Sequence, residues 1–208
     1  MVCLSPMESN THTHTFRLIK TTPANQPTSQ NKTLSTPIEP GLALQGVGWM
    51  TRKMVGLATV TLDIKQFSAP PSPPAEPTSE NFTHVEIEQT GTGGMKGSTE
   101  KRCLDYTFRD HSDWLFGHVK GQSKWISTAE ITDDFLKSGW IETDAEKTGP
   151  NGESHLLSYV ESYDAGWTAT QIWGFKECSD GKRRYARNVV IAKGSERVEL
   201  QLYYDYLE

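Results

Sequence analysis

Apolar residues recur at every second position through most of the chain after residue 58, which is the pattern of strands with one buried face. In the stretch 59–67, for example, Val60, Leu62 and Ile64 alternate with polar residues. Short glycine-containing turns separate such stretches, including a tight turn at Lys120–Gln122. The pattern predicts strands at Thr59–Phe67, Phe82–Gln89, Lys101–Phe108, Trp114–Val119, Ser123–Ser127, His155–Ser162, Trp167–Phe175, Arg183–Ala192 and Arg197–Tyr206.

Two segments show helical spacing instead. Apolar residues at 47, 50, 54 and 57 predict a short helix within Gly41–Leu57. Its glycines each cost up to about 1 kcal/mol relative to alanine, so we expect a helical lid over another structure and not a core helix. Thr128–Ser138 is predicted to form one further helical turn. The segment Ala69–Pro77 is too rich in proline to pair in a sheet and is predicted to be a loop.

The chain divides into a polar beginning and one domain. Residues 1–40 are expected to form a poorly ordered extension, in which only Phe16–Ile19 could make a strand, and residues 41–208 form the domain. About nine strands in meander order must form a sandwich or close on themselves. Closure removes exposed edges. We therefore predict a closed antiparallel up-and-down β-barrel of about nine to ten strands with a short helical lid.

Composition limits the function. The net charge of -5 argues against nucleic acid as a partner, and no apolar run reaches the length that membrane insertion requires. The first ten residues do not look like a secretory signal, and three cysteines without metal-ligand spacing fit a reducing compartment. We expect a cytoplasmic monomer without a metal or other cofactor; His12 and His14 are expected to be solvated and not metal ligands.

Several short segments follow one another in the order seen in a known family. They are Leu44–Lys53, Gly56–Ala58, Leu62–Gln66, Gln171–Trp173, Asp180–Lys182 and a last strand that contains Tyr204. Together they resemble intracellular fatty-acid-binding proteins, and the whole resembles more closely the small fungal lipocalin-like proteins of the calycin superfamily. The resemblance implies a flattened barrel with a fatty acid or similar ligand inside.

The resemblance also implies that an arginine and a tyrosine near the end of the last strand hold the ligand carboxylate. The tyrosine falls at Tyr204, but the arginine falls at Leu202. This departure favours a neutral or weakly polar ligand, because a buried carboxylate needs a charged partner. Arg187 in the neighbouring strand either substitutes for the missing arginine or lies on the outer face. A second departure is the polar stretch Pro23–Gln30 at the position of the strand that should open the barrel.

Alternation assigns the inward faces of the strands and hence the candidate site. The last strand should direct Leu200, Leu202 and Tyr204 inward, and an aromatic cavity with a few polar groups suits a small molecule. Proton donors in it would be Tyr106, Tyr159, Tyr204 and His118, of which Tyr204 and His118 are the catalytic candidates. The predicted ligand-binding residues are Trp49, Met54, Tyr106, Phe108, Trp114, Tyr159, Gln171, Trp173, Arg187, Leu202 and Tyr204.

Two further motifs are interpreted as turns. Gly91–Gly97 resembles a phosphate loop, but the sequence after it does not suit a helix, so a hairpin is expected. Asp110–Asp113 places a histidine between carboxylates and could form a weak metal or acid–base site, but a turn between strands is favoured.

Two functions remain open. The first is intracellular binding of a hydrophobic small molecule, either a lipid or a secondary metabolite, inside the barrel. The alternative is a cofactor-free cyclase, isomerase or dehydratase of a fungal natural-product pathway that uses the same pocket, because positioning and one proton donor can lower a barrier considerably. The sequence does not decide whether the protein is an enzyme.

Overall fold

A computed structural model describes residues 27–93 and 97–207 of the chain. The described helices are α1 (Glu39–Leu44), α2 (Trp49–Leu57) and α3 (Asp134–Lys137), with 3-10 turns at Thr128–Glu130 and Asp144–Glu146. The described strands are β1 (Thr28–Gln30), β2 (Val60–Ala69), β3 (Phe82–Gly91), β4 (Ser98–Cys103), β5 (Arg109–Asp113), β6 (Gly117–Ile126), β7 (His155–Ser162), β8 (Thr168–Glu177), β9 (Arg183–Lys193) and β10 (Glu196–Tyr206).

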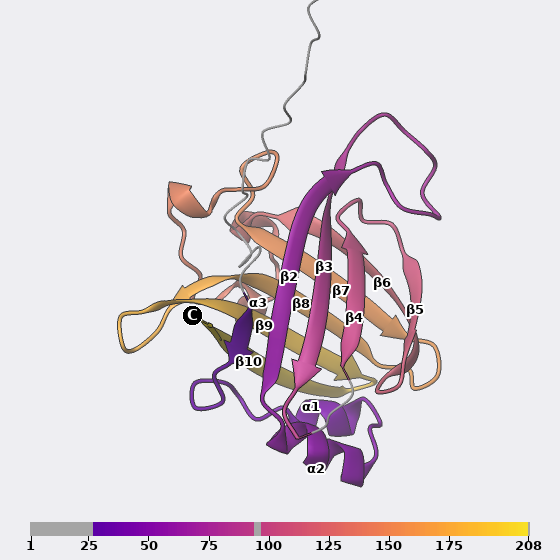
Figure 1. The fold of residues 1–208 in the computed structure, drawn as a ribbon, viewed down its shortest axis with the longest axis vertical. Coiled ribbons are helices and arrows are strands. Elements are labelled where there is room, and N and C mark those ends of the chain that lie inside the picture. The colour runs from indigo at the N-terminus through magenta and orange to yellow at the C-terminus, as the bar shows by residue number, and fades with distance from the viewer. Residues whose placement is uncertain (1–26, 94–96, 208) are drawn as a thin grey trace, which may run out of the picture.

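These strands form one antiparallel sheet in the order β4-β3-β2-β1-β10-β9-β8-β7-β6-β5 (Figure 1). The sheet curls around an interior, as predicted for a barrel. The prediction that the barrel is closed is not confirmed, because within residues 27–93 and 97–207 no ladder joins β4 to β5. The result is a curled, open barrel with a lateral gap between its two edge strands.

The strand that opens the barrel, β1, lies in the polar stretch Pro23–Gln30, which the sequence pattern did not predict to be a strand. Thr28–Gln30 pairs with Tyr204–Tyr206 of β10 and with β2, so it connects the first and last parts of the barrel. The alternative strand Phe16–Ile19, together with His12 and His14, lies outside the described residues. The domain boundary at residue 41 stays a prediction, although β1 and the start of α1 already belong to the segment 1–40.

Three predicted features between residues 101 and 127 are wrong. The tight turn at Lys120–Gln122 does not exist, because β6 runs through it and pairs with β7 along its length. The strand predicted at Lys101–Phe108 ends at Cys103, after which the chain turns at Tyr106 with a φ of 58°. The motif Asp110–Asp113, interpreted as a turn, lies in β5.

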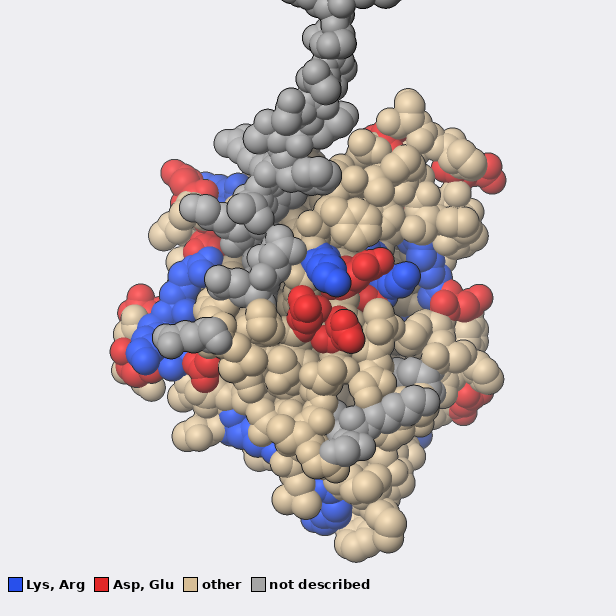
Figure 2. Space-filling view, viewed as in Figure 1, with Lys and Arg blue, Asp and Glu red and all other residues tan. Residues whose placement is uncertain are grey.

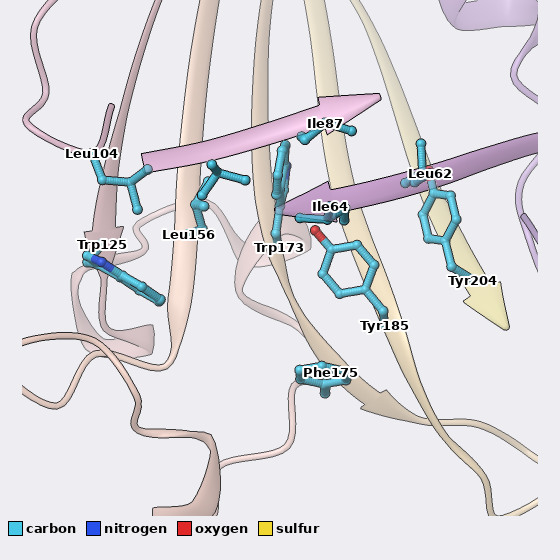
Figure 3. Packing of buried hydrophobic residues seen from close by; sticks show 11 residues of the cluster. Leu62, Ile64, Ile87, Leu104, Trp125, Leu156, Trp173, Phe175, Tyr185 and Tyr204 are labelled. Atoms are coloured by element: carbon cyan, nitrogen blue, oxygen red, sulfur yellow. The ribbon is translucent and has the colours of Figure 1, made fainter. Parts of the chain in front are cut away.

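Buried apolar residues form two groups inside the barrel. The packed cluster joins β2 and β3 to β7–β10 (Figure 3), whereas the cavity cluster joins α1 to β6 and β8–β10. The packed cluster is Leu62, Ile64, Val85, Ile87, Leu104, Trp125, Leu156, Trp173, Phe175, Tyr185 and Tyr204. The cavity cluster is Leu44, Val119, Trp167, Ala169, Val189, Ile191 and Leu200.

The two ends of the fold are covered differently. At one end α1 packs directly on β9 and β10: a Cβ on Gly41 would lie 2.7 Å from the Ile191 side chain and 2.9 Å from that of Leu200. The predicted lid is therefore two helices, of which α1 plugs the barrel. On the outer face of β8 and β9, the segment around α3 buries Trp140 together with Ile172 and Ala186.

Candidate functional site

A cavity of about 510 Å³ lies beside the cavity cluster, within the range of about 300–1,000 Å³ that is usual for small-molecule pockets. Its apolar wall comes from β6–β9 and the turn before β6. The Phe116 ring meets the Trp167 ring edge-on at 5.8 Å between centroids, which fixes one side of this wall. The apolar wall consists of Phe116, Val119, Val160, Trp167, Ala169, Val189 and Ile191.

The opposite wall carries a partly buried ion pair on β4. Glu100 and Arg102 face the interior because their partners in β3, Ile87 and Val85, belong to the packed cluster. The Arg102 guanidinium donates to the Glu100 carboxylate and to the Ser158 hydroxyl. Because Ser158 lies on β7, this one side chain spans the interior from one edge of the sheet toward the other.

A second arginine lies next to this ion pair. The Arg187 guanidinium sits 4.2 Å from the Trp173 ring centroid, and the Arg102 guanidinium sits 5.2 Å from the same ring. Burial raises the pKa of Glu100, but Arg102 and Arg187 together outweigh it and hold that pKa below its usual value. These three ionised groups therefore leave an excess positive charge at the polar end of the interior.

Arg187 is also incompletely hydrogen-bonded. Its side chain is buried, and its Nε and Nη2 atoms have no acceptor among the described residues. The Nε of Arg102 likewise lacks a partner within that part of the chain. Unsatisfied buried donors are costly in a folded protein. Arg102 lines the cavity, so its Nε is exposed to the space that a small molecule would fill.

One predicted ligand-binding residue, Gln171, lines the cavity; its Oε1 accepts a hydrogen bond from Trp173 Nε1 at 3.2 Å. Trp173 and Tyr204 lie in the packed cluster beside the cavity (Figure 3). Arg187 and Leu202 also face the interior and lie against this cluster. Arg187 is thus on the inner face, and the outer-face alternative is wrong. Burial raises the pKa of the Tyr204 phenol, which keeps it a proton donor.

Four other candidates do not point into the barrel. Tyr106 and Trp114 are exposed, and Phe108 packs edge-on against Tyr159 at 6.3 Å. Tyr159 alternates along β7 with Ser158 and Val160, which belong to the interior, so its own side chain lies on the outer face. The predicted inward orientation of these four residues is wrong.

The remaining candidates also lie away from the cavity. The His118 side chain is 71% exposed and forms an ion pair with Asp164 at 3.4 Å. Trp49 and Met54 lie on the outer side of α2 and are 62% and 56% exposed. A largely uncharged surface surrounds this end of the molecule in Figure 2. Within the helical segment Glu39–Leu57, Gln45 is the residue that lines the cavity.

The sequence analysis missed the residues that give the cavity its polar character. Glu100 and Arg102 were overlooked because the strand was predicted to start at Lys101 and to direct Leu104, Tyr106 and Phe108 inward. The available signal was the alternation of Glu100, Arg102 and Leu104 with Thr99, Lys101 and Cys103. Charged residues at alternate positions look like a solvent-facing strand, so the pattern alone misleads.

The described residues offer little for metal or phosphate chemistry. In residues 27–93 and 97–207 there is no group of three histidine, cysteine or acidic side chains that could hold a metal ion. The possible phosphate loop Gly91–Gly97 lies between β3 and β4, and its residues 94–96 are outside the described part. Asp110 and His111 of the Asp110–Asp113 motif both line the cavity, and Asp110 also accepts a hydrogen bond from the Tyr163 hydroxyl at 2.7 Å. No helix in the described part is long and apolar enough to cross a membrane.

Solved structures confirm the class of fold. A fatty-acid-binding protein from the brain of Drosophila melanogaster superposes with a TM-score of 0.51 at 13% identity, covering 88% of this chain and 98% of that one. Lipid binding protein 8 of Caenorhabditis elegans gives a TM-score of 0.52 at 11% identity, covering 88% and 94%. The fold is therefore the calycin-type barrel of the fatty-acid-binding proteins, as the resemblance implied.

Sequence relatives define the family more narrowly. The chain matches no family model. It is 30% identical over 168 residues to pericyclase pydY of an Acremonium species, covering 80% of this chain and 82% of that protein. It is 27% identical over 185 residues to the probable pericyclase scpY of Mollisia scopiformis, covering 88% and 89%. The chain belongs to the family of fungal proteins that includes pericyclase pydY.

Proposed function

We propose that this protein binds a flexible, largely apolar metabolite in its cavity and catalyses the cyclisation of that molecule by a pericyclic reaction. The observation that carries the proposal is the division of the cavity into an apolar wall and an ion pair, in a chain related to pericyclases. This is the enzyme alternative of the sequence analysis, and it includes the binding of a hydrophobic ligand as its first step.

For a pericyclic reaction, the main task of a protein is to hold the substrate in a reactive, folded conformation. In a cycloaddition between a diene and an alkene of one molecule, two carbon–carbon bonds form as three π bonds become one, and no proton or electron leaves the substrate. The barrier is lowered when the reacting carbons are held close together, which can supply about 7–11 kcal/mol in favourable cases. The rings of Phe116 and Trp167 and the side chains of Val189 and Ile191 would hold such a folded conformer.

The ion pair would activate the alkene of the substrate electronically. A hydrogen bond from Arg102 to a carbonyl conjugated with the alkene withdraws electron density from it and makes it a better partner for the diene. Glu100 and Ser158 hold the Arg102 guanidinium in place, so little reorganisation is needed when the carbonyl oxygen gains charge. The excess positive charge contributed by Arg187 acts in the same direction.

The test is conversion of a candidate linear precursor, extracted from a producing fungus that lacks the gene, by the purified protein. A cyclised product of unchanged mass with a new retention time supports the proposal, and Arg102→Met should slow its formation by about a hundredfold. Loss of one water would identify a dehydratase instead. Precursor that binds tightly and is recovered unchanged would identify a carrier.

A further inference from the structure

The cavity reaches the surface through the side of the barrel. Consecutive residues of a strand point to opposite faces, so a cavity under one face touches every second residue. Here it touches Thr99, Glu100, Lys101, Arg102 and Cys103 in succession. A cavity touches successive residues in this way where it runs along the free edge of a strand.

The same feature occurs on the other side of the gap. The cavity is lined by Arg109, Asp110 and His111 in succession on β5, and by Gly121, Gln122 and Ser123 on β6. The β5 ladder stops at the pair Arg109–Gly121, so β6 is an edge beyond that point. The cavity therefore lies across the slot bounded by β4 on one side and by β5 and β6 on the other.

Within the helical segment Glu39–Leu57, the cavity touches Gln45 alone, and α1 is closely packed on the barrel. Gly41 of α1 has no room for a Cβ against Ile191 and Leu200, and Leu42, Val47 and Val55 are buried beneath and between the two helices. The exposed apolar residues of α2 point away from the cavity. The helices act as a plug in this conformation.

The proline-rich loop after β2 lies over the slot, and the Arg109 side chain ties its Ser72–Pro73 part there. Pro73 and Pro74 line the cavity. The Arg109 guanidinium donates to the carbonyl oxygens of Ser72 at 2.6 Å and of Pro73 at 3.1 Å. Asp105 holds the same guanidinium through two hydrogen bonds at 2.7 and 2.6 Å.

We propose that the ligand enters and leaves through the slot between β4 and β5, and that Arg109, held by Asp105, latches the Ser72–Pro74 segment over it. An elongated apolar molecule fits such a route because it can pass lengthwise between two unpaired strand edges. This inference rests on the proposed function, since it requires that the cavity takes up a ligand.

The test compares one bulky label at two positions. Lys101→Cys places a cysteine beside the slot, and Lys53→Cys places one on the exposed side of α2; both side chains are exposed. Each protein, with Cys3 and Cys178 changed to serine, is reacted with a bulky maleimide and mixed with Nile red in a stopped-flow fluorimeter. The label at residue 101 should slow Nile red association by about tenfold or more, whereas the label at residue 53 should leave it unchanged.

The role of Arg109 is tested separately, by the rates at which Nile red binds and dissociates. Arg109→Gln should raise the association and dissociation rates of Nile red together, by up to about tenfold, and leave the Kd nearly unchanged. Slower association with the label at residue 53, or equal rates for both labelled proteins, would overturn the slot as the route. If the unlabelled protein does not bind Nile red at all, the proposal that the cavity binds an apolar ligand fails. That result differs from equal association rates of the two labelled proteins, which would overturn only the slot as the route.

Discussion

Arg187 of β9 lies directly opposite Leu202 of β10 in the antiparallel ladder. Cross-strand partners share a face of the sheet, so the guanidinium occupies the interior next to the position where the related fatty-acid-binding pattern has its arginine. The positive charge missing from β10 is thus supplied by the neighbouring strand. It faces the rings of Trp173 and Tyr204 at 4.2 and 5.4 Å from their centroids.

Arg187 should cost stability when no ligand is bound. Its Nε and Nη2 have no acceptor in the described residues, and Arg102 already pairs with the carboxylate of Glu100. Arg187→Met keeps the length of the side chain and removes the buried charge, so the free energy of unfolding should rise by about 1–3 kcal/mol. Urea denaturation measures this, with Leu202→Met as the control on the opposite strand. A loss of stability would mean that attraction to Glu100 and the rings exceeds the cost of burial.

The ion pair of Glu100 and Arg102 should behave as one unit. Arg102→Met leaves the partly buried Glu100 carboxylate with Arg187 as its remaining partner and frees the Ser158 hydroxyl, which should cost about 1–3 kcal/mol. Glu100→Gln alone leaves two guanidinium groups without a carboxylate. The double variant should therefore lose less stability than the sum of the single variants. Additive losses in this double-mutant cycle would show that the two side chains do not interact.

Filling the cavity should abolish binding without unfolding the protein. Ala169 on β8 lines the cavity, so Ala169→Phe places a ring in the space that a ligand needs. Nile red affinity should fall by about tenfold or more, while the free energy of unfolding falls by no more than about 3 kcal/mol. Thr170→Phe puts the same ring on the outer face of the same strand and serves as the control. If the two variants bind Nile red with equal affinity, Nile red does not bind in this cavity.

The alternation of apolar residues predicted most of the sheet because each long strand has one buried face. His155–Ser162 was predicted with the bounds that the structure has, and β10 differs by one residue. The error at Lys120–Gln122 has a local cause. Gly121 has ordinary room for a Cβ (3.4 Å from the Tyr159 carbonyl oxygen) and pairs with Val160 in the middle of the β6·β7 ladder, so this glycine lies inside a strand and does not mark a turn.

The candidate site was less predictable because it depends on contacts between distant residues. Alternation correctly directed Trp173 and Tyr204 inward, but it could not tell a packed interior from a hollow one. The role of Arg102 depends on Ser158, which lies 56 positions away on β7. Tyr106 was misplaced because a tyrosine at φ 58° leaves the strand conformation, and nothing in the local pattern marks that change.

Lys176 is buried on the outer side of the sheet beneath the segment around α3. Its Nζ donates to Asn188 Oδ1 at 2.7 Å and lies 4.6 Å from the Trp140 ring centroid. Burial lowers the pKa of Lys176 from 10.5 to about 8. Below about pH 8 the lysine is charged in both the folded and the unfolded states, so folding carries the full cost of burying the charge.

Between about pH 8 and 10.5 the unfolded state binds a proton that the folded state lacks, so this cost decreases as the pH rises and is gone above 10.5. Lys176→Met removes the charge and leaves Asn188 Oδ1 without this donor, for a net gain of about 1–2 kcal/mol at pH 7. Urea unfolding of both proteins at pH 7 and pH 10 isolates Lys176, because other titrating groups cancel in the difference. The gain should shrink or change sign at pH 10, and an equal gain at both pH values would contradict the assigned pKa.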